Sequence, residues 1–196
     1  FTWTGPYGGG KSSLALMLCS LVGPNPRLRA RARDILDLPA DSPVYRAFDA
    51  RGEGWLVVPV VGKRASVVQE LHSVLIRVRG GGRKKHGDLV AELVAAAEAH
   101  RQGVLVVVDE LGKFLEASAQ GTGDDIYFFQ ELAEAASRTA GKLVVVGILH
   151  QAFDAYATRL GRDARDDWAK VQGRFVDIPL VAASDEVIEL IGQAIH

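Results

Sequence analysis

The chain has 196 residues, of which 48% are hydrophobic and 24% are charged, and its formal net charge is −1. Such a chain can bury a substantial core as one domain, and its near-zero charge gives no argument for binding to nucleic acid or membrane. No apolar run approaches the roughly 20 residues that cross a bilayer. The single cysteine, Cys19, cannot form an internal disulfide, so we expect a cytoplasmic protein without a membrane segment.

The first residues carry the most informative motif. Residues 1–4 are aromatic and β-branched, as at the end of a strand, and residues 5–12 match G-x-x-x-x-G-K-[ST], the loop that wraps nucleotide phosphates. Its glycines let backbone N–H groups turn inward. Lys11 supplies positive charge for the β- and γ-phosphates, and the Ser12 hydroxyl suits Mg²⁺. We expect nucleotide contacts from Gly5, Pro6, Tyr7, Gly8, Gly9, Gly10, Lys11, Ser12 and Ser13.

The region after the loop predicts a helix that ends near Val22, and its N-terminal dipole favours phosphate. Residues 24–54 have no strong periodicity, and their alternating arginines fit either a docking helix or a solvated surface helix. Residues 55–61 predict a strand, which Pro59 places at a sheet edge because it has no N–H. Two capped helices follow, from Ser66 and from Asp88. The basic loop between them, residues 80–87, fits either a phosphate backbone or plain solvent exposure.

The most hydrophobic strand is predicted at residues 104–108, and its continuous apolar run is typical of a central parallel strand. It delivers Asp109 and Glu110 at its carboxyl end, where open α/β sheets bind ligands. We expect Asp109 to hold Mg²⁺ through its water shell and Glu110 to act as general base toward the attacking water. The alternative is an Asp-Glu pair that merely opens the next loop.

In the second half of the chain, predicted strands and helices alternate as they do in the first half. A helix is expected from about residue 124 to 141, and a buried strand at 143–149 ends in His150 and Gln151. His150 is a candidate to contact the γ-phosphate or the attacking water, and a loop histidine without a role is the alternative. A helix at 152–160, a charged stretch, a strand at 174–180 and a helix from Ser184 complete the prediction. This alternation predicts an α/β fold, a mostly parallel sheet with helices on both faces.

The phosphate loop, a strand that ends in Asp109-Glu110 and a strand that ends in a polar residue together resemble the P-loop ATPases with a catalytic glutamate. That resemblance implies a five-stranded sheet in the order 5-1-4-3-2. Residues 168–175 are similar to the AAA+ segment in which an arginine before the last strand reaches a neighbour's nucleotide, which would be Arg174 here. Origin-recognition-type AAA+ proteins and STAND signalling ATPases are the most similar groups. Residues 109–116 also resemble large bacterial ATPases of defence systems.

Some features of the sequence depart from the AAA+ pattern, and others disfavour particular classes of P-loop protein. Residues 24–54 look like an insertion in an ATPase core of residues 1–183, and residues 184–196 would only begin the usual helical lid. No Asn-Lys-x-Asp occurs, which disfavours guanine nucleotides, and no Leu-Ser-Gly-Gly-Gln occurs, which disfavours an ABC transporter. Because the chain opens in the last turn of a strand, we expect it to be a piece of a longer protein.

Residues and resemblance together predict binding of ATP and Mg²⁺-dependent hydrolysis to ADP and phosphate. The expected catalytic residues are Lys11, Glu110, His150 and Arg174, and the expected metal ligands are Ser12 and Asp109. Arg174 implies a homo-oligomer, whereas a nucleic-acid or protein target remains open. Arg174 has the alternative of pairing with a surface carboxylate such as Asp177, and its rivals are Arg159, Arg162 and Arg165. A slow ATP/ADP switch and a small-molecule kinase are the alternative functions.

Overall fold

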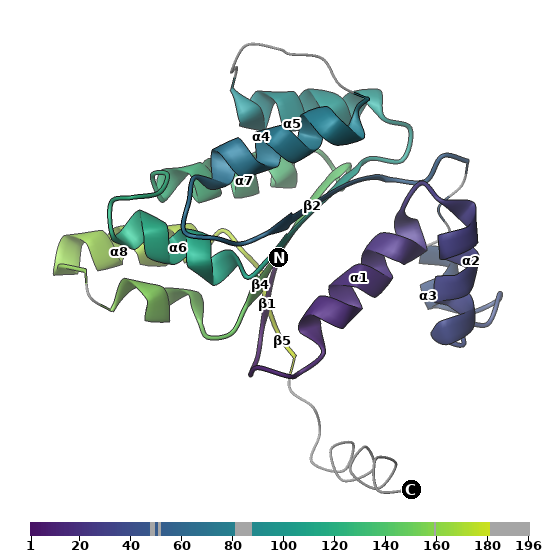
Figure 1. The fold of residues 1–196 in the computed structure, drawn as a ribbon, viewed down its shortest axis with the longest axis horizontal. Coiled ribbons are helices and arrows are strands. Elements are labelled where there is room, and N and C mark those ends of the chain that lie inside the picture. The colour runs from purple at the N-terminus through teal and green to yellow at the C-terminus, as the bar shows by residue number, and fades with distance from the viewer. Residues whose placement is uncertain (48–49, 51, 81–87, 159, 181–196) are drawn as a thin grey trace, which may run out of the picture.

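The computed structural model describes residues 1–47, 50, 52–80, 88–158 and 160–180. Its strands form one parallel sheet in the order β2-β3-β4-β1-β5, flanked by helices (Figure 1). This is the 5-1-4-3-2 order read from the other edge, so the predicted α/β class and strand order are confirmed. The strands are β1 (Thr2–Thr4), β2 (Leu56–Val61), β3 (Val104–Asp109), β4 (Leu143–Leu149) and β5 (Asp177–Pro179).

The two central strands are the most hydrophobic segments of the chain. In β3 every residue from Val104 to Val108 is buried, and β4 is buried at all positions except Val144. Continuous burial follows from helices on both faces, since neither face of a central parallel strand meets water. By contrast, β2 is an edge strand, and Pro59 on it is exposed, as its missing N–H predicts.

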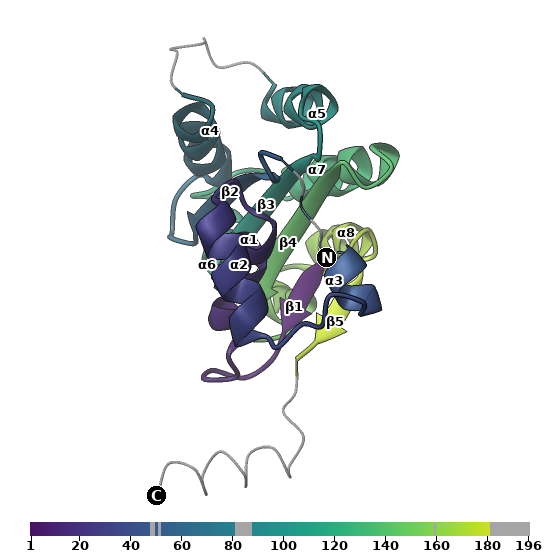
Figure 2. The same cartoon turned by 90° about the vertical axis from the view of Figure 1, so that its right-hand side faces the viewer.

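Helices cover the two faces of the sheet unequally. On one face lie α1 (Lys11–Val22), α2 (Pro26–Ile35) and α3 (Pro43–Ala47) (Figures 1 and 2). The opposite face carries the larger of two hydrophobic clusters, in which Leu71, Leu93 and Phe114 are fully buried. The elements of that face are α4 (Val67–Val78), α5 (Leu89–Ala99), α6 (Leu111–Ala119), α7 (Tyr127–Arg138), η1 (Phe153–Ala157) and α8 (Arg162–Gln172).

Local capping agrees with the sequence at several positions. The Ser66 side chain accepts a hydrogen bond from the Gln69 N–H at 3.1 Å, and the Asp88 side chain caps α5. The helix after the loop ends at Val22 as expected. Cys19 on that helix is only partly buried, but this burial still raises the pKa of its thiol to about 11. The thiol is therefore protonated and unreactive at neutral pH.

Several predicted elements were wrong in type or extent. The helix α6 lies where no element was predicted, α8 occupies the charged stretch, and residues 152–160 contain the short 3₁₀-helix η1 instead of an α-helix. The long helix α7 begins at Tyr127, later than predicted, and β5 is shorter than residues 174–180. The helix predicted from Ser184 and most of the loop at 80–87 lie outside the described residues. Within the described part, no helix has the length and apolar character needed to cross a membrane.

Candidate nucleotide-binding site

The glycine-rich loop joins the carboxyl end of β1 to the start of α1. Gly8 and Gly10 have φ of 76° and 72°. This left-handed conformation is unfavourable for residues that carry a side chain, and glycine adopts it without that penalty. The Lys11 side chain turns back beneath the loop, where its Nζ donates hydrogen bonds to the Gly5 and Pro6 carbonyls at 2.7 and 2.6 Å. Lys11 is only 4% exposed, so the loop encloses its positive charge.

The first glycine of the loop is required by the neighbouring strand. The Leu180 N–H donates to the Thr4 carbonyl at 2.7 Å, which holds the end of β5 against the end of β1. A Cβ on Gly5 would lie 2.3 Å from the Leu180 carbonyl oxygen, closer than real Cβ contacts. Gly5 therefore allows the loop to leave β1 directly beside β5.

The predicted carboxylates lie at the same edge of the sheet as the loop. Asp109 is the last residue of β3, and its Oδ1 accepts a hydrogen bond from the Glu110 N–H at 2.9 Å. Since β1, β3 and β4 run parallel, their carboxyl ends share one edge. The charges of Lys11, Glu110 and Asp109 all act on His150, which follows β4. The predicted grouping of these four residues is therefore found in the structure.

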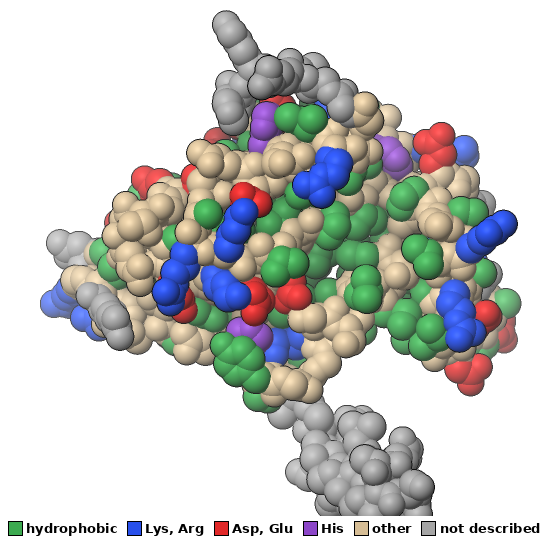
Figure 3. Space-filling model, in the orientation of Figure 1, with side chains coloured by type: hydrophobic (Ala, Val, Ile, Leu, Met, Phe, Trp, Pro, Cys, Tyr) green, Lys and Arg blue, Asp and Glu red, His purple; other side chains and the backbone are tan. Residues whose placement is uncertain are grey.

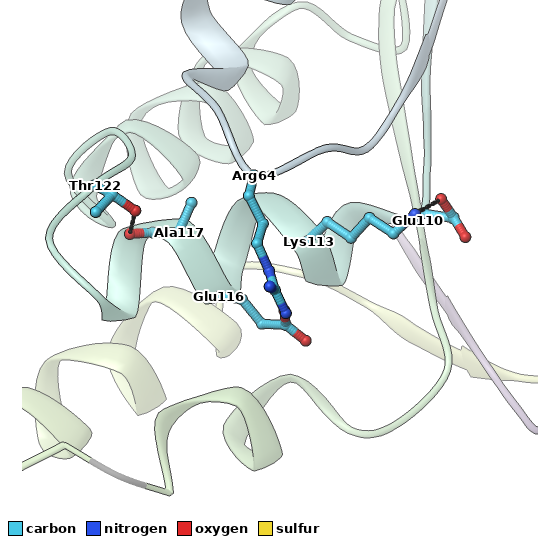
Figure 4. A network of polar contacts seen from close by, with 6 residues as sticks. All are labelled: Arg64, Glu110, Lys113, Glu116, Ala117 and Thr122. Carbon is cyan, nitrogen blue, oxygen red and sulfur yellow. Dashed lines mark hydrogen bonds and ion pairs between the residues drawn. The ribbon is translucent and has the colours of Figure 1, made fainter.

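Glu110 has an unusual backbone conformation. Its φ is 52°, in the left-handed region that residues other than glycine, asparagine and aspartate rarely adopt. The peptide after it packs against the turn that follows β2, where a Cβ on Gly62 would lie 2.0 Å from the Glu110 carbonyl oxygen. The Glu110 carboxylate forms an ion pair with Lys113 of α6 (Figure 4). Strained backbone of this kind is concentrated at functional sites.

His150 stacks on an aromatic residue of the loop. Its ring lies 3.7 Å from the Tyr7 ring, centroid to centroid, with 21° between the planes. Both ring nitrogens are buried, and neither has a hydrogen-bond partner among the described residues. Burial, and then the positive charge of Lys11, lower the pKa of His150 below its ordinary value. We therefore expect a neutral imidazole at pH 7.

His150→Phe should reduce the loss of stability at acid pH, because it keeps a ring next to Tyr7 and removes the titration. The folded-state pKa of His150 lies below the unfolded value, so the unfolded chain binds the proton first. The stabilising contribution is fully present above the ordinary histidine pKa of about 6.5 and is lost as the pH falls toward and through the folded value.

Urea titrations of the wild type and the variant at pH 7.5 and 5.5 measure this difference through the free energy of unfolding. The wild type should lose more of it between the two pH values than His150→Phe does. Equal losses of the free energy of unfolding in the wild type and in His150→Phe would contradict a lowered pKa of His150 in the folded protein.

A cleft of about 690 Å³ opens beside the loop. Figure 3 shows this face, on which basic and acidic side chains gather near α6. The cleft joins three predicted site residues to residues of α6, of the turn after β2 and of η1. Its lining is Tyr7, Lys63, Arg64, Glu110, Gly112, Lys113, Glu116, His150, Gln151 and Tyr156.

Arg174 does not join the loop of its own chain. It precedes β5, at the strand end opposite Leu180, and its Nε lies 3.4 Å from Glu134 Oε1. The predicted alternative of an ion pair is thus present, although the partner is Glu134. Asp177 instead accepts hydrogen bonds from the hydroxyls of Thr2 and Thr4. A role of Arg174 at a neighbouring subunit stays a prediction.

Lys113 is the site residue that the sequence analysis missed. Its spacing of three residues from Glu110 would have predicted the ion pair, but only if a helix had been recognised at residues 111–119. Leu111, Gly112, Phe114 and Leu115 are buried there, and this apolar pattern is the signal that indicates the helix.

The comparisons with known proteins assign no family. No protein-family model matches the chain, and a search of curated proteins gives no significant match.

Proposed function

We propose that this chain binds Mg·ATP on the loop of residues 5–13 and hydrolyses it to ADP and phosphate. The observation that carries the proposal is the enclosed Lys11 ammonium, held by two loop carbonyls at the edge of the sheet where Asp109 and Glu110 emerge. An ammonium at the base of a glycine-rich loop, next to a helix N-terminus, is suited to polyphosphate.

The residues present fit a magnesium ion bound together with a nucleotide. The described residues contain no group of three or more His, Cys, Asp and Glu that would hold a metal alone. Mg²⁺ keeps several waters and takes phosphate oxygens, so one hydroxyl and one carboxylate are enough protein ligands. Ser12 in the first turn of α1 would supply the hydroxyl, Asp109 at the end of β3 would hold the ion through its water shell, and the ion would neutralise charge on the phosphates.

In this proposal each protein group has a distinct task. Lys11 binds the β- and γ-phosphates, and Glu110 accepts the proton of the attacking water. His150 contacts the water or the phosphate in this proposal, which requires one of its buried ring nitrogens to become accessible when ATP binds. Catalysis then rests on positioning and on electrostatic stabilisation, with no covalent intermediate.

Titration calorimetry with ATP and Mg²⁺, combined with a phosphate-release assay, tests the proposal. We expect saturable binding at one site per chain and release of phosphate that requires Mg²⁺. Asp109→Asn should weaken the Mg²⁺-dependent part of the binding, because it removes the carboxylate charge that holds the hydrated ion. A well-folded chain that does not bind ATP would contradict the proposal.

Two variants of this function are distinguished by the same assays. Tight binding with very slow turnover, and an assembly state that depends on the nucleotide, would identify an ATP/ADP switch. A small-molecule kinase would release ADP without phosphate when its acceptor is present. A rate of hydrolysis per chain that rises with protein concentration would support a homo-oligomer in which Arg174 acts on a neighbouring subunit.

A further inference from the structure

The ion pair between Glu110 and Lys113 involves the residue that the proposed hydrolysis needs as a free base. The Lys113 ammonium contacts Oε2 of Glu110, and the two side chains are 48% and 32% exposed. Lys113 is the only partner of the Glu110 carboxylate among the described residues' hydrogen bonds and ion pairs. An ammonium at this oxygen competes with water for the carboxylate.

The backbone of Glu110 is held on both sides, so its movement cannot separate the carboxylate from Lys113. Its carbonyl accepts the Lys113 N–H at 3.0 Å and lies against Gly62, and the Gly62 N–H donates to the Asp109 carbonyl at 2.7 Å. The peptide is thus held between the start of α6 and the turn after β2. Only rotation of the side chains can separate the carboxylate from the ammonium.

The helix that carries Lys113 is also fixed. Its first residue, Leu111, fills the space that a Cβ on Gly147 of β4 would need, and Gly112 lies against the Tyr156 ring. One turn further on, Glu116 accepts hydrogen bonds from Arg64 at 3.1 and 3.3 Å (Figure 4). Lys113 therefore projects from a rigid element toward Glu110.

The charge of Lys113 also acts on the rest of the site. Burial, and then the charges of Lys11 and Lys113, lower the pKa of His150, whereas the two carboxylates raise it. Lys113 lines the cleft beside the loop with Lys63 and Arg64. Of the three, it is the one that contacts a predicted catalytic residue, since Lys63 pairs with Glu70 and Arg64 with Glu116.

We propose that Lys113 is a positioning residue that restrains Glu110, so that the carboxylate must leave the ammonium before it can accept a proton from water. This inference rests on the proposed function. Lys113 has no assigned contact with ATP or with the attacking water and acts through Glu110. Because the pair is partly exposed, the restraint is modest: exposed ion pairs shift an equilibrium by no more than about fivefold.

The test compares Lys113→Met, Lys113→Arg and Lys63→Met in steady-state ATP hydrolysis. Lys113→Met should raise kcat about two- to fivefold with KM unchanged, because it removes a weak exposed pair and no phosphate contact. Lys113→Arg keeps the charge and should retain the parental kcat. Lys63→Met makes the same charge change in the same cleft without touching Glu110, so it should leave kcat unaltered.

Salt provides a second measurement, because exposed ion pairs are screened. The ratio of kcat between Lys113→Met and wild type should fall toward one as ionic strength rises from about 0.02 to about 0.5 M. An unchanged kcat in Lys113→Met would overturn the restraint. A slower Lys113→Met with unchanged KM would also overturn it and would assign the ammonium to stabilisation of the transition state.

Failure of this inference is distinguishable from failure of the proposed function. Wild-type protein that binds and hydrolyses ATP while Lys113→Met shows no gain contradicts the restraint alone. Wild-type protein that does not bind ATP contradicts the function, and with it the premise of the restraint.

Discussion

Lys11→Ala is expected to abolish measurable ATP binding while the protein stays folded. The Lys11 ammonium is enclosed by the loop, where it donates to the Gly5 and Pro6 carbonyls, and in the proposed function it exchanges these carbonyls for phosphate oxygens when ATP binds. Hydrogen bonds to charged groups contribute about 1.5–3 kcal/mol each, so the loss of two phosphate contacts weakens binding more than about 100-fold. Alanine is a good helix former at the first position of α1, so the helix is retained.

Calorimetry on Lys11→Ala and on Lys170→Ala measures this effect, with circular dichroism to verify folding. Lys170 is exposed on α8 and pairs with Asp167 at 2.8 Å, so its replacement makes the same charge change away from the loop. Lys170→Ala should bind ATP like the wild type. A folded Lys11→Ala protein with parental affinity would contradict both the site and the proposed function.

The sheet could be predicted from the sequence because its strands carry strong local signals. Buried parallel strands are continuous apolar runs, and both 104–108 and 143–149 show this pattern without a charged residue. The loop motif then located the carboxyl edge, and the order followed from the resemblance to glutamate-dependent P-loop ATPases. Pro59 identified the edge strand, because a proline on an inner strand would break a ladder hydrogen bond.

The missed helices have a different physical origin. In α6 the residues Leu111, Phe114 and Leu115 pack against the core, while Gly112 meets Tyr156 of η1. Glycine disfavours helix, and here tertiary packing overrides that weak local preference. In α8 the charged face dominates the sequence, and of the side chains whose burial is described only Trp168 and Val171 are buried. Two apolar residues three apart are too few to predict a helix from periodicity.

At the site, the sequence predicted which residues meet but not how they contact one another. The stacking of Tyr7 on His150 joins a loop residue to one that follows β4, so it depends on the order of β4 and β1 in the sheet. The left-handed conformation of Glu110 has no local signal, because glutamate does not favour it. It follows from the close approach of the turn after β2, where only Gly62 fits.

Glu110→Gln is expected to retain ATP binding and to lose hydrolysis. The substitution keeps the size of the side chain and an oxygen that can accept from Lys113, but it removes the basic carboxylate. General-base catalysis contributes about 10²- to 10⁴-fold to a rate, so phosphate release in a single turnover should fall by at least about 100-fold. The ATP dissociation constant should change by less than about threefold, because Glu110 makes no predicted phosphate contact.

The matched control for this variant is Glu116→Gln. Glu116 lies on α6, the helix that Glu110 precedes, and lines the same cleft, and it pairs with Arg64 at 3.1 Å instead of with Lys113. Its replacement makes the same change of charge and should leave hydrolysis within about twofold of the wild type, since exposed ion pairs are weak. A Glu110→Gln protein that releases phosphate at the parental rate would remove Glu110 as the base. A loss of the same size in Glu116→Gln would show that the charge of the cleft, and not one carboxylate, sets the rate.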